Sequence, residues 1–170
     1  MANTYNAIAT VTVGAGGASN IEFTSIPNSY TDLQILCSLK TSRTSAFDNF
    51  EMILNGNTSI IYSVRRLNGN GSTASSTSET DNKFDIVSGI NGAYSSDAFS
   101  NVSVYLPNYA SGNNKTASFD DVAEYNNTQG EITMMAGLFS NTSAITSIKL
   151  QSGFNFVQYS TATLYGIKNS

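Results

Sequence analysis

The chain has no histidine and no tryptophan, and it has a single cysteine. Because histidine is the commonest general base and the commonest ligand of transition metals, its absence excludes Ser-His-Asp and Cys-His catalytic arrangements. One cysteine without histidine also excludes a conventional structural zinc site. Cys37 lies in an alternating apolar run, so we expect it to be a small buried residue and not a reactive thiol.

Charged residues are also scarce. They make up 12% of the chain, and 8 Lys and Arg against 12 Asp and Glu give a net charge of −4. Binding to nucleic acid requires clustered basic side chains. The only adjacent basic pair is Arg65-Arg66. We therefore expect no nucleic-acid partner.

Long apolar runs are missing too. None approaches the roughly 20 residues that a membrane helix needs, so we expect no membrane partner. The opening residues, MANTY, contain neither the basic nor the apolar region of a secretory signal. We expect a protein that is made in a cytoplasm without a signal peptide.

Neutral polar residues dominate what is present, since Ser, Thr and Asn supply 63 of the 170 residues. Their side chains compete with the hydrogen bonds of a helical backbone, and Thr is also well suited to strands. This composition disfavours helix. The chain also contains neither a phosphate-binding loop nor a dinucleotide fingerprint, so we expect no cofactor.

Apolar residues recur with a period of two, which is typical of strands with one buried face. The clearest run covers residues 30–40, where Leu33, Ile35, Cys37 and Leu39 alternate with polar residues. Asn55-Gly56 predicts a tight hairpin turn. The pattern predicts one all-β domain over 1–170, a β-sandwich or jelly roll of about ten short antiparallel strands. The expected strands cover 5–13, 21–25, 30–40, 47–54, 60–67, 83–87, 102–106, 117–124, 131–139, 145–151 and 156–167.

One segment departs from this pattern. Residues 68–82, NGNGSTASSTSETDN, contain no large apolar side chain and are rich in Ser, Thr and Gly. Such a segment cannot supply a core face, so we predict an exposed, mobile loop. It is either a solvated hairpin tip or a contact loop for a neighbouring subunit or a host surface.

Two groups of side chains are candidates for chemistry or binding. Paired carboxylates could serve a glycosidase, but neighbours such as Asp120 and Asp121 point to opposite faces of a strand. Calcium binding by Asp120, Asp121 and Glu124 stays open. We expect no catalytic or metal-binding residue. The other carboxylates considered as a catalytic pair are Glu79, Asp81 and Asp85.

The second group consists of tyrosines near expected loops or strand ends, which could contact a glycan or an interface. They are Tyr94, Tyr105, Tyr109 and Tyr125.

The two ends of the chain resemble a family of small virion proteins of tailed phages. The opening, MANTYNAIATVTVGAGGASNIEFTSIPNSYTDLQI, is similar to the start of that family. The close, SAITSIKLQSGFNFVQYSTATLYGIKNS, is similar to its C-terminal strand pair, and STATLYGIK is the most specific piece. LPNYASGNNKT looks like a shared turn. Residues 47–99 show no close resemblance.

This resemblance implies a β-sandwich or jelly-roll module on a phage particle, in a capsid decoration (cement) protein, a head fibre or a tail fibre. No catalytic residues come with the family. The leading hypothesis is a non-enzymatic virion-surface protein that stabilises or decorates the major-capsid lattice. Its expected partners are the major capsid protein, other virion subunits and further copies of itself, for example in a trimer. The alternative is a tail- or head-fibre module that recognises a host cell-surface polysaccharide.

Overall fold

The computed structural model describes residues 4–92, 98–124 and 130–168. Within these ranges the chain forms twelve strands and no helix, so no described helix could cross a membrane. The strands are β1 (Thr4–Thr12), β2 (Ala18–Phe23), β3 (Asp32–Leu39), β4 (Phe47–Leu54), β5 (Tyr62–Gly69), β6 (Ala74–Asp81), β7 (Phe84–Asn91), β8 (Ser100–Leu106), β9 (Lys115–Glu124), β10 (Gly130–Phe139), β11 (Ile148–Phe156) and β12 (Thr161–Lys168).

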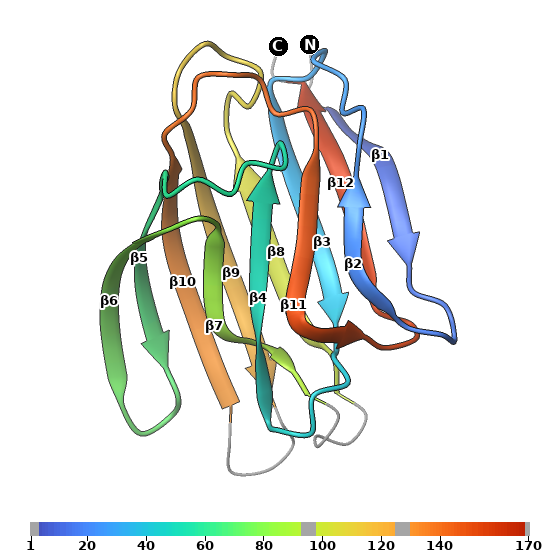
Figure 1. The fold of residues 1–170 in the computed structure, drawn as a ribbon, viewed down its shortest axis with the longest axis vertical. Helices are drawn as coiled ribbons and strands as arrows, with labels where there is room; N and C mark the ends of the chain where they lie inside the picture. Colours follow the sequence, from blue (N-terminus) through green and yellow to red (C-terminus); the bar gives the residue numbers. More distant parts are fainter. Residues whose placement is uncertain (1–3, 93–97, 125–129, 169–170) are drawn as a thin grey trace.

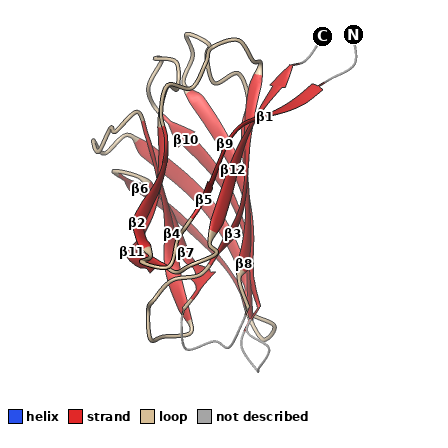
Figure 2. Cartoon of the chain, turned by 90° about the vertical axis from the view of Figure 1, so that its right-hand side faces the viewer, coloured by secondary structure: helices blue, strands red, loops and turns tan. Residues whose placement is uncertain are grey.

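Two sheets form the two layers of a sandwich (Figures 1 and 2). The larger sheet has eight strands in the order β1-β12-β3-β8-β9-β10-β5-β6, and the smaller has four in the order β2-β11-β4-β7. All pairings between these strands are antiparallel. The predicted all-β class and β-sandwich architecture are confirmed.

The alternating pattern places the core as expected. In β3 the side chains of Leu33, Ile35, Cys37 and Leu39 are buried, while Leu36 on the other face is 43% exposed. The prediction for Cys37 is confirmed, and burial raises the pKa of its thiol. Residues from both sheets join one hydrophobic cluster, so the core lies between the two layers.

A cluster of aromatic rings joins β7 of the smaller sheet to the larger sheet. The Tyr62 ring lies 5.0 Å from the Phe84 ring, edge to face, and 4.7 Å from the Phe139 ring. Phe84 also lies 5.3 Å from Phe119. Edge-to-face and tilted contacts at these separations stabilise a core beyond the area that they bury. The Tyr62 hydroxyl donates to the carbonyl of Asn57, so its polar end is satisfied.

The Asn55-Gly56 turn has the predicted backbone but not the predicted role. Both residues have positive φ, 53° and 62°. However, the turn follows β4 of the smaller sheet and leads to β5 of the larger one, so the hairpin prediction is wrong. The Asn55 side chain accepts from the amides of Thr146 (2.8 Å) and Ser147 (3.2 Å), and this holds the turn as a corner between sheets.

The strand expected over 156–167 begins only at Thr161, after a turn. β11 ends at Phe156, and β12 begins at Thr161 in the other sheet. Between them Tyr159 takes a φ of 71° and is 68% exposed. Alternation continues through this turn by residue type alone, so a period-two pattern could not reveal the break.

The loop predicted over 68–82 is wrong, although its predicted exposure is correct. β5 continues to Gly69, and β6 pairs with it over eight consecutive residues. Only a short turn remains, in which the Asn70 side chain accepts from the amides of Ser72 (3.1 Å) and Thr73 (2.8 Å). Main-chain pairing and not apolar burial makes β6 a strand, because most of its residues are exposed.

A buried lysine organises the turn between β8 and β9, within the LPNYASGNNKT segment. Lys115 is 1% exposed. Its ammonium donates to the carbonyls of Ser111 (2.7 Å), Asn113 and Thr142 (3.3 Å). These carbonyls replace the water that the charge loses, although burial still lowers the pKa of Lys115. The lysine thereby joins this turn to the loop that precedes β11.

Candidate functional site

Four apolar side chains lie together on the outer face of the larger sheet, which is the face turned away from the smaller sheet. Leu67 of β5 pairs with Met134 of β10, and Ile132 of β10 pairs with Val122 of β9. Their exposed fractions are 53% for Leu67, 57% for Met134, 58% for Ile132 and 44% for Val122. We call these residues the apolar patch.

The apolar patch adjoins a groove of about 760 Å³, whose described lining comes from β5, β6, β9 and β10. Leu67 and Met134 lie in the groove, where Asp120 of β9 stands beside Met134 and Arg65 stands two residues along β5 from Leu67. Both charged residues are exposed. An apolar centre with a charged and hydroxyl-bearing rim is the usual composition of a protein interface.

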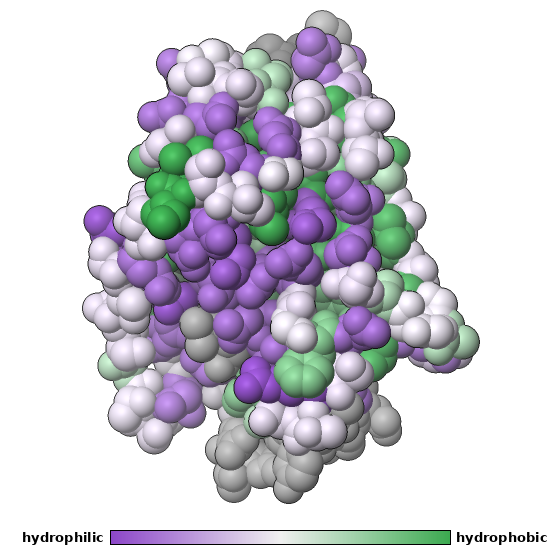
Figure 3. Space-filling model, in the orientation of Figure 1, coloured by the Kyte–Doolittle hydropathy of each residue, from purple (hydrophilic) through white to green (hydrophobic). Residues whose placement is uncertain are grey.

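The opposite face of the molecule differs in character. Figure 3 shows this face, over the smaller sheet, where hydrophilic residues gather with only separate hydrophobic spots between them. Glu51 on β4 accepts there from Gln151 on β11 at 2.8 Å. The contrast makes the outer face of the larger sheet the better candidate for contact with another molecule.

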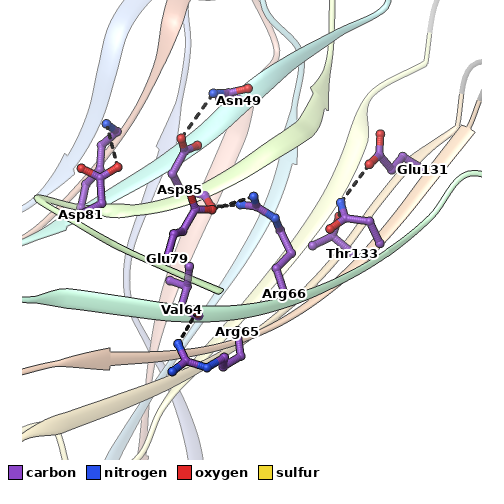
Figure 4. A network of polar contacts seen from close by, with 11 residues as sticks. Asn49, Val64, Arg65, Arg66, Glu79, Asp81, Asp85, Glu131 and Thr133 are labelled. Carbon is purple, nitrogen blue, oxygen red and sulfur yellow. Dashed lines mark hydrogen bonds and ion pairs between the residues drawn. The ribbon is translucent and has the colours of Figure 1, made fainter. Parts of the chain in front are cut away.

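A polar network lies where β5 and β6 extend past β7, the edge of the smaller sheet (Figure 4). Arg66 is 7% exposed; its guanidinium pairs with Glu79 at 2.6 Å and donates to the main-chain carbonyl of Asp85 at 2.8 Å. Asn68 donates to Glu131 and Thr133, both at 2.9 Å. The network holds β5, β6, β7 and β10 together.

Two carboxyl groups in this region have raised pKa values. Burial raises the pKa of Asp85 to about 6, and the charge of Glu51 adds to this while Lys83 and Arg66 oppose it. Burial raises the pKa of Asp121 to about 9, and the charge of Glu131 adds to it. Asp121 is 1% exposed, and within the described residues neither of its carboxyl oxygens has a hydrogen-bond partner of good geometry; the nearby main-chain N–H of Val122 only partly opposes the rise in its pKa. Asp121 is therefore neutral at pH 7.

The carboxylates singled out in the sequence do not converge as a calcium site. Asp120 and Glu124 are exposed on the outer face, whereas Asp121 points inward. In the other group, Glu79 and Asp81 lie on a strand and not in a loop, and Asp81 approaches Lys83 at 3.6 Å. The Arg66 guanidinium pairs with the Glu79 carboxylate but donates to the main-chain carbonyl of Asp85, so it joins the two strands without bringing their carboxylates to one site.

The tyrosines do not form the expected contact patch in the described part of the chain. Tyr109 is fully buried, and its hydroxyl donates to the carbonyl of Pro27, so the prediction that it contacts a glycan or an interface is wrong. Tyr105 is half-buried and donates to Asp32 at 2.8 Å; burial, followed by this bond, raises its pKa to about 12. Tyr94 and Tyr125 lie outside the described residues.

Sequence reasoning missed the apolar patch, although a signal was present. The segment 131–139, EITMMAGLF, has apolar residues at both parities: Ile132 and Met134 at one, Met135 and Phe139 at the other. The structure buries Met135 and Phe139 and exposes the first pair. Two apolar faces on a strand that has only one sheet packed against it indicate an additional contact surface.

No family model matches the chain, and none of the curated proteins matches it. Among solved structures, the chain is similar to the CBM2 module of the evolved Dit of Lactobacillus casei BL23 phage J-1. The identity is 14%, the match covers 89% of this chain and 69% of that chain, and the TM-score is 0.27. A TM-score this low does not establish a shared fold, so nothing is carried from that module to this chain.

Proposed function

We propose that this chain is a non-enzymatic structural protein on the surface of a phage particle, where it stabilises or decorates the major-capsid lattice. The resemblance of both chain ends to small virion proteins supports this role, and so does the β-sandwich architecture. The observation that carries the proposal is the apolar patch, because a sheet face that exposes Leu67, Ile132 and Met134 is suited to cover another protein surface.

The proposed occupant of the apolar patch is a neighbouring virion subunit, with the major capsid protein as the leading candidate. The patch spans three adjacent strands and is flanked by one positive side chain, Arg65, and one negative side chain, Asp120. A partner surface with an apolar centre and charges of opposite order would match it. Burial of apolar area, at about 25 cal/mol per Å² before entropic costs, supplies the affinity. Because the same contact is repeated at many positions on the capsid, the combined attachment is stronger than a single contact.

The alternative role, recognition of a host polysaccharide by a fibre module, has less support. Sugar rings stack on exposed aromatic faces, yet two of the tyrosines singled out in the sequence do not offer one, since Tyr109 is buried and Tyr105 is held by Asp32. Phe119 is the aromatic residue among the described residues that line the groove, and its ring is 1% exposed. Binding to a glycan array, with no binding to capsids, would favour this alternative over the proposal.

Replacing Met134 by aspartate is expected to weaken binding to capsids that lack this protein by about tenfold to a hundredfold. The reason is that a charge at the centre of an apolar contact loses its water and gains no partner, at a cost of about 1–3 kcal/mol. Met134 is 57% exposed, so the substitution should leave the fold intact. Co-sedimentation of the purified chain with capsids measures the change.

Ile60→Asp is the matched control, because Ile60 is an apolar residue that is 73% exposed and lies outside the patch. It should bind as the unchanged chain does. The heat resistance of capsids with and without the chain completes the test. Equal binding by the Met134 and Ile60 variants, or no gain in capsid stability, would contradict the proposal.

A further inference from the structure

β6 is an edge strand with an open side. It ends the larger sheet, and within the described residues β5 is its only partner in that sheet (Figure 1). Six of its eight residues are exposed, and none has a large apolar side chain. A strand that buries so little gains its stability almost entirely from main-chain pairing. The unpaired N–H and C=O groups on its other side are a template for a further strand.

Two of the other three edges, β1 and β7, are irregular, the third, β2, is short and pairs with a strand that bulges, and β6 shows none of this. Along β1 the pairing with β12 shifts between Ala7 and Ala9. The β4–β7 ladder shifts between Asp48 and Phe50, and the β11–β2 ladder shifts between Gln151 and Phe156. Such irregularities prevent a new strand from adding to an edge. The β5–β6 ladder runs through eight residue pairs without a shift.

The sequence of β6 also lacks the residues that usually protect an edge. It contains no proline and no lysine, and residues 74–78 carry no charge. The two acids, Glu79 and Asp81, lie at one end of the strand. Glu79 is directed away from the open side by its 2.6 Å ion pair with Arg66. A regular, neutral edge of this length fits an antiparallel strand.

We propose that two copies of this chain join through their β6 edges, antiparallel about a two-fold axis at Thr77. In this register Ser75 lies opposite Glu79 of the second copy, and Thr77 lies opposite Thr77. The alternative two-fold axis, at Ser78, would bring the two Glu79 carboxylates to diagonal positions, about 7–8 Å apart. Pairing at Thr77 separates all four acids and forms about six main-chain hydrogen bonds.

A second copy is favoured as the occupant because its edge has the same regular and neutral character. The charges of β6 permit this pairing, since each acid meets a hydroxyl side chain that can donate to it and no acid meets another. The two-fold contact also closes on itself, whereas pairing of β6 with the bulged β1 edge would extend without limit. This inference does not rest on the proposed virion role, and it predicts a dimer where the sequence suggested a trimer.

Sedimentation velocity of the isolated chain tests the proposal through charge reversal at one exposed position. Ser75→Glu places a carboxylate opposite Glu79 of the second copy twice in each dimer, and Ser75→Lys places an ammonium there. We expect the dimer dissociation constant of the Glu variant to be about tenfold above that of the Lys variant. Equal constants, a monomeric unchanged chain or a trimer would overturn the proposal. Equal thermal unfolding of the two variants, at a concentration low enough for both to be monomeric, excludes a folding defect.

Disulfide cross-linking tests the register independently. Thr77→Cys should form a covalent dimer under mild oxidation, because residues directly opposite in a strand pair lie within disulfide reach. Ser78→Cys should not, since the two cysteines would then be offset. The native Cys37 is buried and should not contribute. Cross-linking by the Ser78 variant alone, or by neither, would overturn the register. None of these outcomes depends on capsid binding.

Discussion

Replacing Phe84 by alanine is expected to lower the free energy of unfolding by about 3–5 kcal/mol, the usual cost of removing a buried ring. Phe84 is 1% exposed and packs on Tyr62 and Phe119 of the larger sheet. Its ring fills the space above Gly137, where a Cβ would lie 2.5 Å from the ring. The substitution therefore leaves a cavity between the sheets. Urea unfolding, followed by fluorescence or circular dichroism, measures the loss.

Phe154→Ala is the matched control for this prediction. Phe154 is 48% exposed, and its ring has the Arg43 guanidinium 5.7 Å away. Its removal should cost less than about 1 kcal/mol, since it ends only an exposed cation–π contact and creates no cavity. Similar losses for the two variants would show that Phe84 does not join the layers as described.

The second large effect is a pH dependence caused by Asp121. Its pKa of about 9 in the folded chain lies far above the usual value for an unfolded aspartate, about 4. The folded state therefore holds a proton that the unfolded state has lost. The associated stability is complete below about pH 4 and is lost as the pH rises toward 9. Between pH 6 and 8 the free energy of unfolding should fall by up to about 1.4 kcal/mol per pH unit.

Asp121→Asn should remove this slope, because the amide has the same size and does not titrate. The comparison is made above pH 6, since Asp85, with a pKa of about 6, contributes in the same direction below it. Asp120→Asn changes the exposed neighbour of Asp121 and should leave the slope in place. Denaturant unfolding at several pH values gives the slopes. If the free energy of unfolding had the same slope against pH in the unchanged chain and in the Asp121 variant, the conclusion that Asp121 is buried and neutral would be contradicted.

Local sequence determined the all-β class and most strand positions, because side-chain alternation and turn chemistry are properties of short segments. Cys37 and its neighbours in β3 are buried as their alternation predicts. The Asn55-Gly56 turn likewise has the predicted positive φ values. The opposite orientations of Asp120 and Asp121 also follow from strand geometry alone.

Tertiary structure decided what a local pattern does not contain, namely the partner of each segment. β6 is a strand because its main chain pairs with β5. Its own polar residues do not indicate a strand. Asn55-Gly56 turns between sheets because contacts with the distant residues Thr146 and Ser147 hold it there. The exposure of the apolar patch also depends on the tertiary structure. One layer covers one face of the larger sheet, and Leu67, Ile132 and Met134 stay exposed on the other.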